Sequence, residues 1–118
     1  MAQHNNTGRT GENLAVKYLQ DNGYFIKETN WRHRHWEVDV IASKNDVLHF
    51  IEIKTRRSRK FGFPEEDVNR KKISNLMHAS EEYLINYPGW KRIQFDILSI
   101  NLQQNGPPEY FFIEDVGL

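Results

Sequence analysis

The chain contains no cysteine, no long apolar run and no net charge. The absence of cysteine excludes disulfides and cysteine-ligated zinc, and nothing in the composition indicates an oxidising compartment. No apolar stretch reaches the roughly 20 residues that a membrane-spanning helix needs, and the N-terminus lacks the apolar core of a signal peptide. We therefore expect a cytoplasmic protein without a membrane partner.

The zero net charge conceals two basic segments. The 16 basic and 16 acidic residues balance, which argues against a protein that coats nucleic acid along its whole surface. Basic residues nevertheless gather at 54–60, and the segment 31–36, Trp-Arg-His-Arg-His-Trp, combines basic with aromatic side chains. A local surface that binds phosphate is therefore compatible with the composition.

The length and the apolar periodicity predict a single α/β domain. A chain of 118 residues fits one domain, here 1–118, with the polar residues 1–6 expected to be frayed. Helices are predicted at 8–22 and 66–86, and strands at 24–31, 37–43, 47–55, 90–100 and 110–113. This order, α-β-β-β-α-β-β, predicts a central mixed sheet flanked by helices.

Each predicted helix carries one apolar stripe for the core. The stripe of the first helix consists of Leu14, Ala15, Tyr18 and Leu19. The stripe of the second helix consists of Ile73, Leu76, Met77, Ser80, Tyr83, Leu84 and Tyr87. Glu12 extends the inward side of the first stripe, and Lys72 borders the second. In the strand 90–100, Asp96 is expected on the face opposite to Ile93, Phe95 and Ile97.

Three charged residues interrupt the apolar runs of strands 37–43 and 47–55. They are Asp39, Glu52 and Lys54. Strands with nearly continuous apolar runs are usually covered on both faces. A carboxylate in such a place is costly unless it is paired, hydrogen-bonded or bound to a metal. The two acids and the lysine therefore need a chemical reason to be there.

The connection between these two strands predicts their register. Asn45 and Asp46 suit a two-residue turn, which makes Lys44 face Val47. Side chains alternate along each strand, so every further pair in the hairpin follows from this one. A bulge or a loop of odd length would change the register.

With this register, Asp39 lies opposite Glu52 and Glu37 lies opposite Lys54. Asp39, Glu52 and Lys54 then point to one face, where directly opposed carboxylates repel each other. A divalent cation with oxygen ligands would remove that repulsion. Mg²⁺ suits a site that offers one or two carboxylates and leaves room for phosphate oxygens.

An acid on a first helix, an aspartate, a hairpin and a Glu-x-Lys segment resemble the core pattern of the PD-(D/E)xK nucleases. Here the pattern reads Glu12, Asp39 and Glu52-Ile53-Lys54, with Val38 in place of the nominal proline. The resemblance implies a restriction endonuclease-like fold.

A longer set of residues over 8–100 is similar to the YraN-like family, small and largely uncharacterised bacterial proteins placed with these nucleases. The matching residues are Gly8, Gly11, Glu12, Ala15, Tyr18, Leu19, Gly23, Tyr24, Asn30, Glu37, Val38, Asp39, Val40, Ile41, Ile51, Glu52, Ile53, Lys54, Thr55, Arg56, Phe61, Gly62, Val68, Lys72, Phe95 and Asp96. The family usually has glycine where this chain has Trp36, so the local backbone is open to a difference. The resemblance also implies a fold near the archaeal Holliday junction resolvases.

The facing acids and the resemblance together suggest roles for the central residues. Asp39 and Glu52, completed by Glu12 and the backbone carbonyl of Ile53, are expected to bind Mg²⁺, with Mn²⁺ as a substitute. Lys54 is expected to orient the attacking water or to offset charge on the phosphate. The alternatives are solvated or salt-bridged strand acids, a Lys54 salt bridge and an early-helix acid favoured by the helix dipole.

Residues around this centre receive supporting roles. Glu37 is expected to hold Lys54 or Arg56, or to assist the metal, and Lys72 to contact phosphate or to join the second helix to the acids. Nucleic-acid contacts are expected from Arg56, Arg57, Arg59, Lys60, Arg32 and Arg34. The alternative for both groups of residues is that they are ordinary charged side chains on the solvated surface.

The aromatic residues and the histidines receive no assigned part in the chemistry. Base stacking is open to the three tryptophans, although core packing is their more common use. The histidines show no metal-ligand spacing and receive no role.

The leading prediction is metal-dependent hydrolysis of DNA phosphodiester bonds at a branched or damaged structure. The alternatives are a catalytically inactive nucleic-acid-binding module of the same fold and an enzyme that acts on RNA. A homodimer stays open, since two-strand cleavage needs two sites but no apolar stripe is left over for an interface.

Overall fold

The computed structural model describes residues 4–57 and 69–116 and confirms the predicted order of elements. The elements are α1 (His4–Asp21), β1 (Phe25–His33), β2 (Trp36–Lys44), β3 (Val47–Arg56), α2 (Arg70–Asn86), β4 (Ile93–Asn101) and β5 (Glu109–Ile113). Helix α1 begins four residues before its predicted start, so residues 4–6, predicted to be frayed, are helical. The helix therefore extends toward the N-terminus well beyond Leu14, the first residue of its apolar stripe. Arg59 and Lys60 lie outside the described residues.

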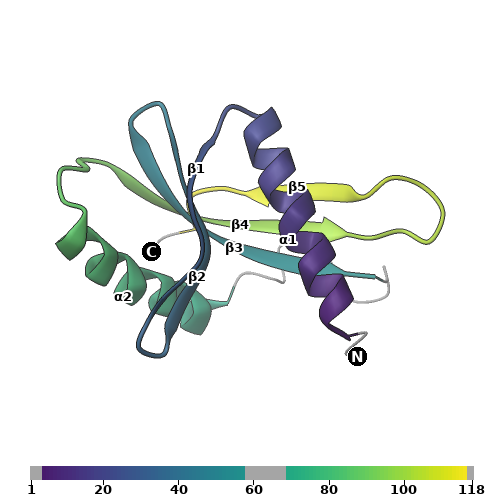
Figure 1. Ribbon diagram of the computed structural model, residues 1–118, viewed down its shortest axis with the longest axis horizontal. Coiled ribbons are helices and arrows are strands. Elements are labelled where there is room, and N and C mark those ends of the chain that lie inside the picture. The colour runs from purple at the N-terminus through teal and green to yellow at the C-terminus, as the bar shows by residue number, and fades with distance from the viewer. Residues whose placement is uncertain (1–3, 58–68, 117–118) are drawn as a thin grey trace.

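The five strands form one mixed sheet in the order β1-β2-β3-β4-β5. Neighbouring strands are antiparallel except β3 and β4, which are parallel. A parallel pair needs a crossover connection, and α2 lies in that connection. Figure 1 shows α1 across the strands on the right and α2 at lower left.

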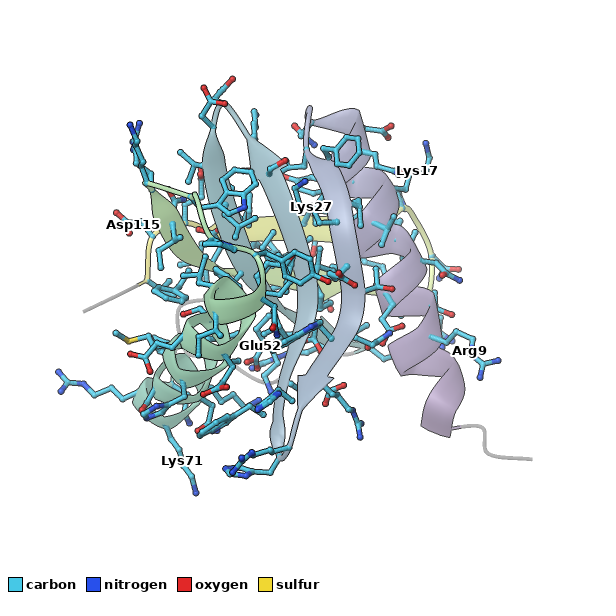
Figure 2. The ribbon with its side chains drawn as sticks, turned by 60° about the vertical axis from the view of Figure 1, so that its left-hand side comes forward. Arg9, Lys17, Lys27, Glu52, Lys71 and Asp115 are labelled. Carbon is cyan, nitrogen blue, oxygen red and sulfur yellow. The ribbon has the colours of Figure 1, made fainter. Side chains whose placement is uncertain are left out.

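Two apolar clusters lie on the two faces of the sheet. On one face, Ala15 and Leu19 of α1 pack against Ile51 of β3. On the other face, Leu76 and Tyr83 of α2 pack in the cluster that contains Ile41, Leu48 and Phe50. The strands therefore lie between the two helices (Figure 2), as predicted for a sheet flanked by helices.

The predicted stripes are confirmed except at one position. Tyr87 is 49% exposed, because α2 ends at Asn86 and Tyr87 is its C-terminal cap. Its ring instead stacks on Tyr83, with the ring centroids 4.6 Å apart. No helix in the described ranges is long and apolar enough to cross a membrane.

The β2–β3 turn is the predicted two-residue turn. Asn45 and Asp46 both have positive φ, 52° and 65°, a conformation that Asn and Asp tolerate better than most residues. Lys44 faces Val47, and the ladder continues in that register as far as Val40 and Ile51. The register prediction is therefore confirmed over this length.

Strand β4, which lies between β3 and β5, buries an acid. Asp96 is fully buried, and its Oδ2 lies 2.7 Å from Nδ1 of His49. Its Oδ1 accepts hydrogen bonds from Gln94 Nε2 at 2.9 Å and from the Asp115 backbone N–H at 2.8 Å. His49, which received no role from the sequence, therefore joins β3 to β4 through a buried polar contact.

Candidate active site

A cleft opens beside β2 and β3, next to the first turns of α2. Its volume is about 290 Å³. It is lined by Glu37, Asp39, Glu52, Ile53, Lys54, Lys72 and Leu76. Six of these seven were predicted from the sequence as site residues, so the fold brings both direct and supporting candidates into one cavity. Figure 2 shows Glu52 between α2 and the strands.

Asp39 is held by the backbone of the neighbouring strand. Its Oδ2 accepts a hydrogen bond from the Ile53 N–H at 2.8 Å. The β2–β3 ladder ends at Val40 and Ile51, so the predicted direct pairing of Asp39 with Glu52 is not part of it. The reason is that the Asp39 carboxylate takes an N–H that strand pairing would otherwise use. Ile53 thus brings its backbone to the cleft while its side chain packs on the α1 face.

The pKa of Asp39 is raised to about 6. Burial is the largest cause, and the charges of Glu52, Glu37 and Glu12 raise it further, while the Ile53 hydrogen bond opposes them. A carboxylate in this setting lacks sufficient positive charge nearby. A cation would supply it, so the electrostatics of the cleft fit a bound metal ion.

The ligand set for such an ion is small. In the parts of the chain that the structure describes, no group of three or more His, Cys, Asp or Glu side chains is arranged to hold an ion. The cleft instead offers Asp39, Glu52 and the main chain of Ile53. Mg²⁺ commonly binds through one or two carboxylates and completes its shell with water and phosphate oxygens, so this set fits it.

Lys72 connects α2 to the acids. Asn69 caps α2 by accepting from the backbone N–H groups of Lys71 and Lys72, which places Lys72 in the first turn. The Lys72 Nζ lies 3.0 Å from Glu52 Oε2. A hydrogen bond with the Lys54 amine raises the Lys72 pKa, as does the neighbouring Glu52 carboxylate. Lys72 therefore remains charged, and this contact is one of the two roles predicted for it.

Glu12 borders the cleft from α1. It does not line the cavity, but its charge is one of those that raise the Asp39 pKa. A Cβ on Gly11 would overlap the Thr55 side chain, so glycine allows α1 to lie directly on β3. Asn30 Nδ2 then donates a hydrogen bond to Glu12 Oε1 at 3.1 Å.

Asn30 is a site residue to which the sequence assigned no role. Its φ is 52°, a left-handed conformation that Asn adopts more readily than most residues. The only sequence signal was its place among the residues of the family resemblance. Its hydrogen bond joins β1 to α1 and orients one carboxylate of the site.

Replacing Asn30 with glycine is expected to keep the backbone and release Glu12. The Asp39 pKa should then fall, since the Glu12 charge moves into solvent, and manganese affinity should drop about tenfold. Carboxyl NMR and calorimetry measure the two effects. Asn45→Gly is the matched control, because it makes the same change at the same φ, 52°, in a turn outside the cleft. Equal behaviour of the two variants would contradict a positioning role for Asn30.

The predicted basic residues occupy two separate places. Arg32 lies opposite Glu37 in the β1–β2 ladder, with its Nε 3.5 Å from Glu37 Oε2, and Arg34 is exposed in the following turn. Arg56 and Arg57 follow Lys54 at the other end of the site, on the last residues of β3 and just beyond it. The nucleic-acid contacts expected of these four arginines stay a prediction.

The tryptophans mainly pack. Trp31, Trp36 and Trp90 are partly buried against the cluster on the α2 face, which agrees with core packing as their more common use.

The comparisons with known proteins agree on one family. The model of an uncharacterised protein family, UPF0102, matches residues 11–100, a range that contains every residue of the cleft and Glu12. A UPF0102 protein of Flavobacterium psychrophilum is 44% identical over 100 residues, covering 85% of this chain and 84% of the relative. A UPF0102 protein of Bacteroides thetaiotaomicron is 40% identical over 106 residues, covering 90% and 87%. One of Dictyoglomus thermophilum is 42% identical over 100 residues, covering 84% and 85%.

Proposed function

Since the chain belongs to the uncharacterised family UPF0102, we propose from the cleft itself that the protein is a metal-dependent nuclease that hydrolyses DNA phosphodiester bonds. One observation carries the proposal. Asp39 has a pKa raised to about 6 by burial and by three other carboxylates, and it shares its cleft with Lys54 and Lys72. A metal-dependent nuclease site combines carboxylates that bind a cation with basic groups that contact the phosphate, and this cleft contains both.

The proposal includes a restriction endonuclease-like fold of the PD-(D/E)xK type. Three features support it: the mixed sheet with one parallel pair, the Asp39 and Glu52-x-Lys54 residues on adjoining strands, and Glu12 on α1 beside them. Substrates that are branched or damaged DNA are part of the same proposal.

In this mechanism Asp39, Glu52 and the Ile53 carbonyl would hold Mg²⁺, with Mn²⁺ as a substitute and Glu12 at the border of the site. The bound ion would polarise the phosphodiester and lower the pKa of a water molecule. Lys54 lies in the same cavity, where its amine, which accepts a hydrogen bond from Lys72, would orient the attacking water. Lys72 holds Glu52 in place and adds a second fixed positive charge.

A second candidate function is a nucleic-acid-binding module without turnover. Two contacts favour it: Lys72 already neutralises Glu52, and the Ile53 N–H already bonds to Asp39. A module of this kind would bind nucleic acid in a salt-sensitive manner. Its binding would persist in Asp39→Ala, and no metal would bring about cleavage.

The test is cleavage of a panel of nicked, branched, duplex and single-stranded DNA, with RNA of matched sequence, in Mg²⁺ or Mn²⁺. We expect the wild-type protein to cut at least one DNA, and Asp39→Ala and Glu52→Ala to reduce the rate by more than about 100-fold. Asp46→Asn, which removes an acid from the same hairpin outside the cleft and keeps a residue that tolerates positive φ, should leave the rate unchanged. An activity equal in wild type and Asp39→Ala would refute the site, and cleavage of RNA alone would refute DNA as the substrate.

A further inference from the structure

We propose that the β1–β2 hairpin and the adjoining surface of α2 form a stacking surface for unpaired nucleotides. The hairpin ends in the turn between His33 and Trp36 and lies against α2. This inference deepens the proposed function, on which it rests for the reaction in the cleft. It adds a class of substrate: a nucleic-acid strand whose nucleotides are unpaired beside the bond to be cut.

Three aromatic rings line this surface in sequence. Trp36 stacks on His78 of α2, with centroids 5.3 Å apart and the planes within 14° of parallel. His35 lies on Trp36 at 4.6 Å, tilted by 45°. Trp36 is partly buried in the α2-face cluster, whereas His35 is exposed. Trp36 therefore contacts two exposed histidine rings, and His35, in the hairpin turn, is the ring that a base can contact.

The hairpin is fixed on α2 by further contacts. His33 Nε2 lies 3.2 Å from Glu82 Oε1. Trp31 stacks on His33 at 6.2 Å and meets the Tyr83 ring edge-on at 5.4 Å. A surface held at several points loses little conformational freedom when it binds, which favours affinity.

The surface around the rings carries cations that can attract a nucleic-acid strand, but acidic side chains there reduce its positive charge. Arg34 and Lys71 are exposed cations on the hairpin turn and on α2, and Figure 2 shows Lys71 pointing away from the fold. Glu81 and Glu82 lie on the same helix beside His78 and His33. Because acids offset part of the basic charge, stacking must supply much of the affinity. This favours exposed bases over the backbone of a duplex, whose bases are already stacked.

The stacking surface leads directly into the cleft. Glu37, which follows Trp36, lines the cavity. Trp36 and Asp39 are three residues apart on β2, about 10 Å along an extended strand. At the rise of about 3.4 Å per nucleotide in a stacked strand, roughly three nucleotides cover that length. A nucleic-acid strand that stacks on His35 can therefore place a phosphate a few nucleotides further along at the acids.

The test is binding without metal, so that it stands apart from cleavage. Fluorescence anisotropy in EDTA measures the binding of a labelled single-stranded oligonucleotide and of the duplex that it forms with its complementary strand. Both are measured for wild type and for Asp39→Asn. We expect the single strand to bind more tightly to both proteins. His35→Ala should weaken that binding about 5- to 20-fold, the effect of one lost stack, while His35→Phe should retain it. Tyr87→Ala removes an exposed ring from the other end of α2 and should change nothing.

The opposite results are equally clear. If wild type binds duplex as well as single strand, or if His35→Ala binds like wild type, the stacking surface is refuted while the cleavage test still decides the proposed function. If His35→Phe loses as much affinity as His35→Ala, the histidine contacts phosphate by charge and the stacking inference is wrong. Thermal melting of each variant shows that the comparison is between folded proteins.

Discussion

Asp39→Asn is expected to make the metal-free protein more stable above pH 6. The carboxyl ionises at about 3.8 in the unfolded chain and at about 6 in the folded one. Between these values the folded state binds more protons, so the free energy of unfolding falls as the pH rises. Above pH 6 the full cost of the ionised, part-buried Asp39 is roughly 3 kcal/mol. Asparagine carries no charge and its Oδ1 can still accept from Ile53, so it removes this cost.

Urea denaturation in EDTA at pH 4 and pH 8 measures the effect. At pH 8 the variant should exceed wild type by about 1 to 3 kcal/mol, and below pH 4 the two should be nearly equal because both side chains are neutral. Asp46→Asn, the same change in the exposed turn of the hairpin, should shift stability by less than about 0.5 kcal/mol at both pH values. A variant less stable than wild type at pH 8 would show that Asp39 contributes to stability as an anion.

Asp96→Ala is expected to destabilise the protein by about 3 to 5 kcal/mol, because several buried donors lose their acceptor at about 1 to 3 kcal/mol each. The substitution leaves three donors without their acceptor, on His49, on Gln94 and on the Asp115 backbone. It also leaves a small cavity beside β4. The loss should be visible as a lower urea midpoint at pH 7.

The control for Asp96 is Asp21→Ala, which removes an exposed acid paired with Lys17 at 3.1 Å. That variant should lose less than about 1 kcal/mol. The double variant Asp96→Ala/His49→Ala should lose less than the two single losses added together, because each single change already breaks their contact. A loss below about 1 kcal/mol for Asp96→Ala, or additive losses in the double variant, would show that this contact does not hold β3 to β4.

The sequence predicted the parts of the site that depend on local rules. A two-residue turn at Asn45 and Asp46 fixes the hairpin register as far as Val40 and Ile51. The predicted pair of Asp39 and Glu52 lies beyond these last paired residues, although both acids line the cleft. Helical periodicity likewise placed Lys72 at the edge of its stripe, next to the cleft. These inferences need only neighbours in the sequence, which is why they hold in the structure.

The features that escaped prediction depend on contacts between distant segments. The ladder stops after Val40 because a side chain competes with the backbone for the Ile53 N–H. The hydrogen bond from Asn30 to Glu12 requires α1 to lie on β3, and the His49–Asp96 contact requires β4 to pair in parallel with β3. His49 and Asp96 are polar residues in two otherwise apolar strands, which is compatible with a contact between them. The sequence does not show which strands are neighbours, so it could not predict that contact.

The most direct test of the proposed metal site is calorimetric titration of Mn²⁺ into wild type, Asp39→Asn, Glu52→Gln and the control Asp46→Asn, with and without DNA. We predict one ion per chain in wild type and in Asp46→Asn, with an affinity that rises as the pH passes through 6 and Asp39 loses its proton. Binding should be lost in the two cleft variants. Wild type that binds no Mn²⁺ even with DNA present, or Asp39→Asn that binds it as wild type does, would contradict a metal centre at Asp39 and Glu52.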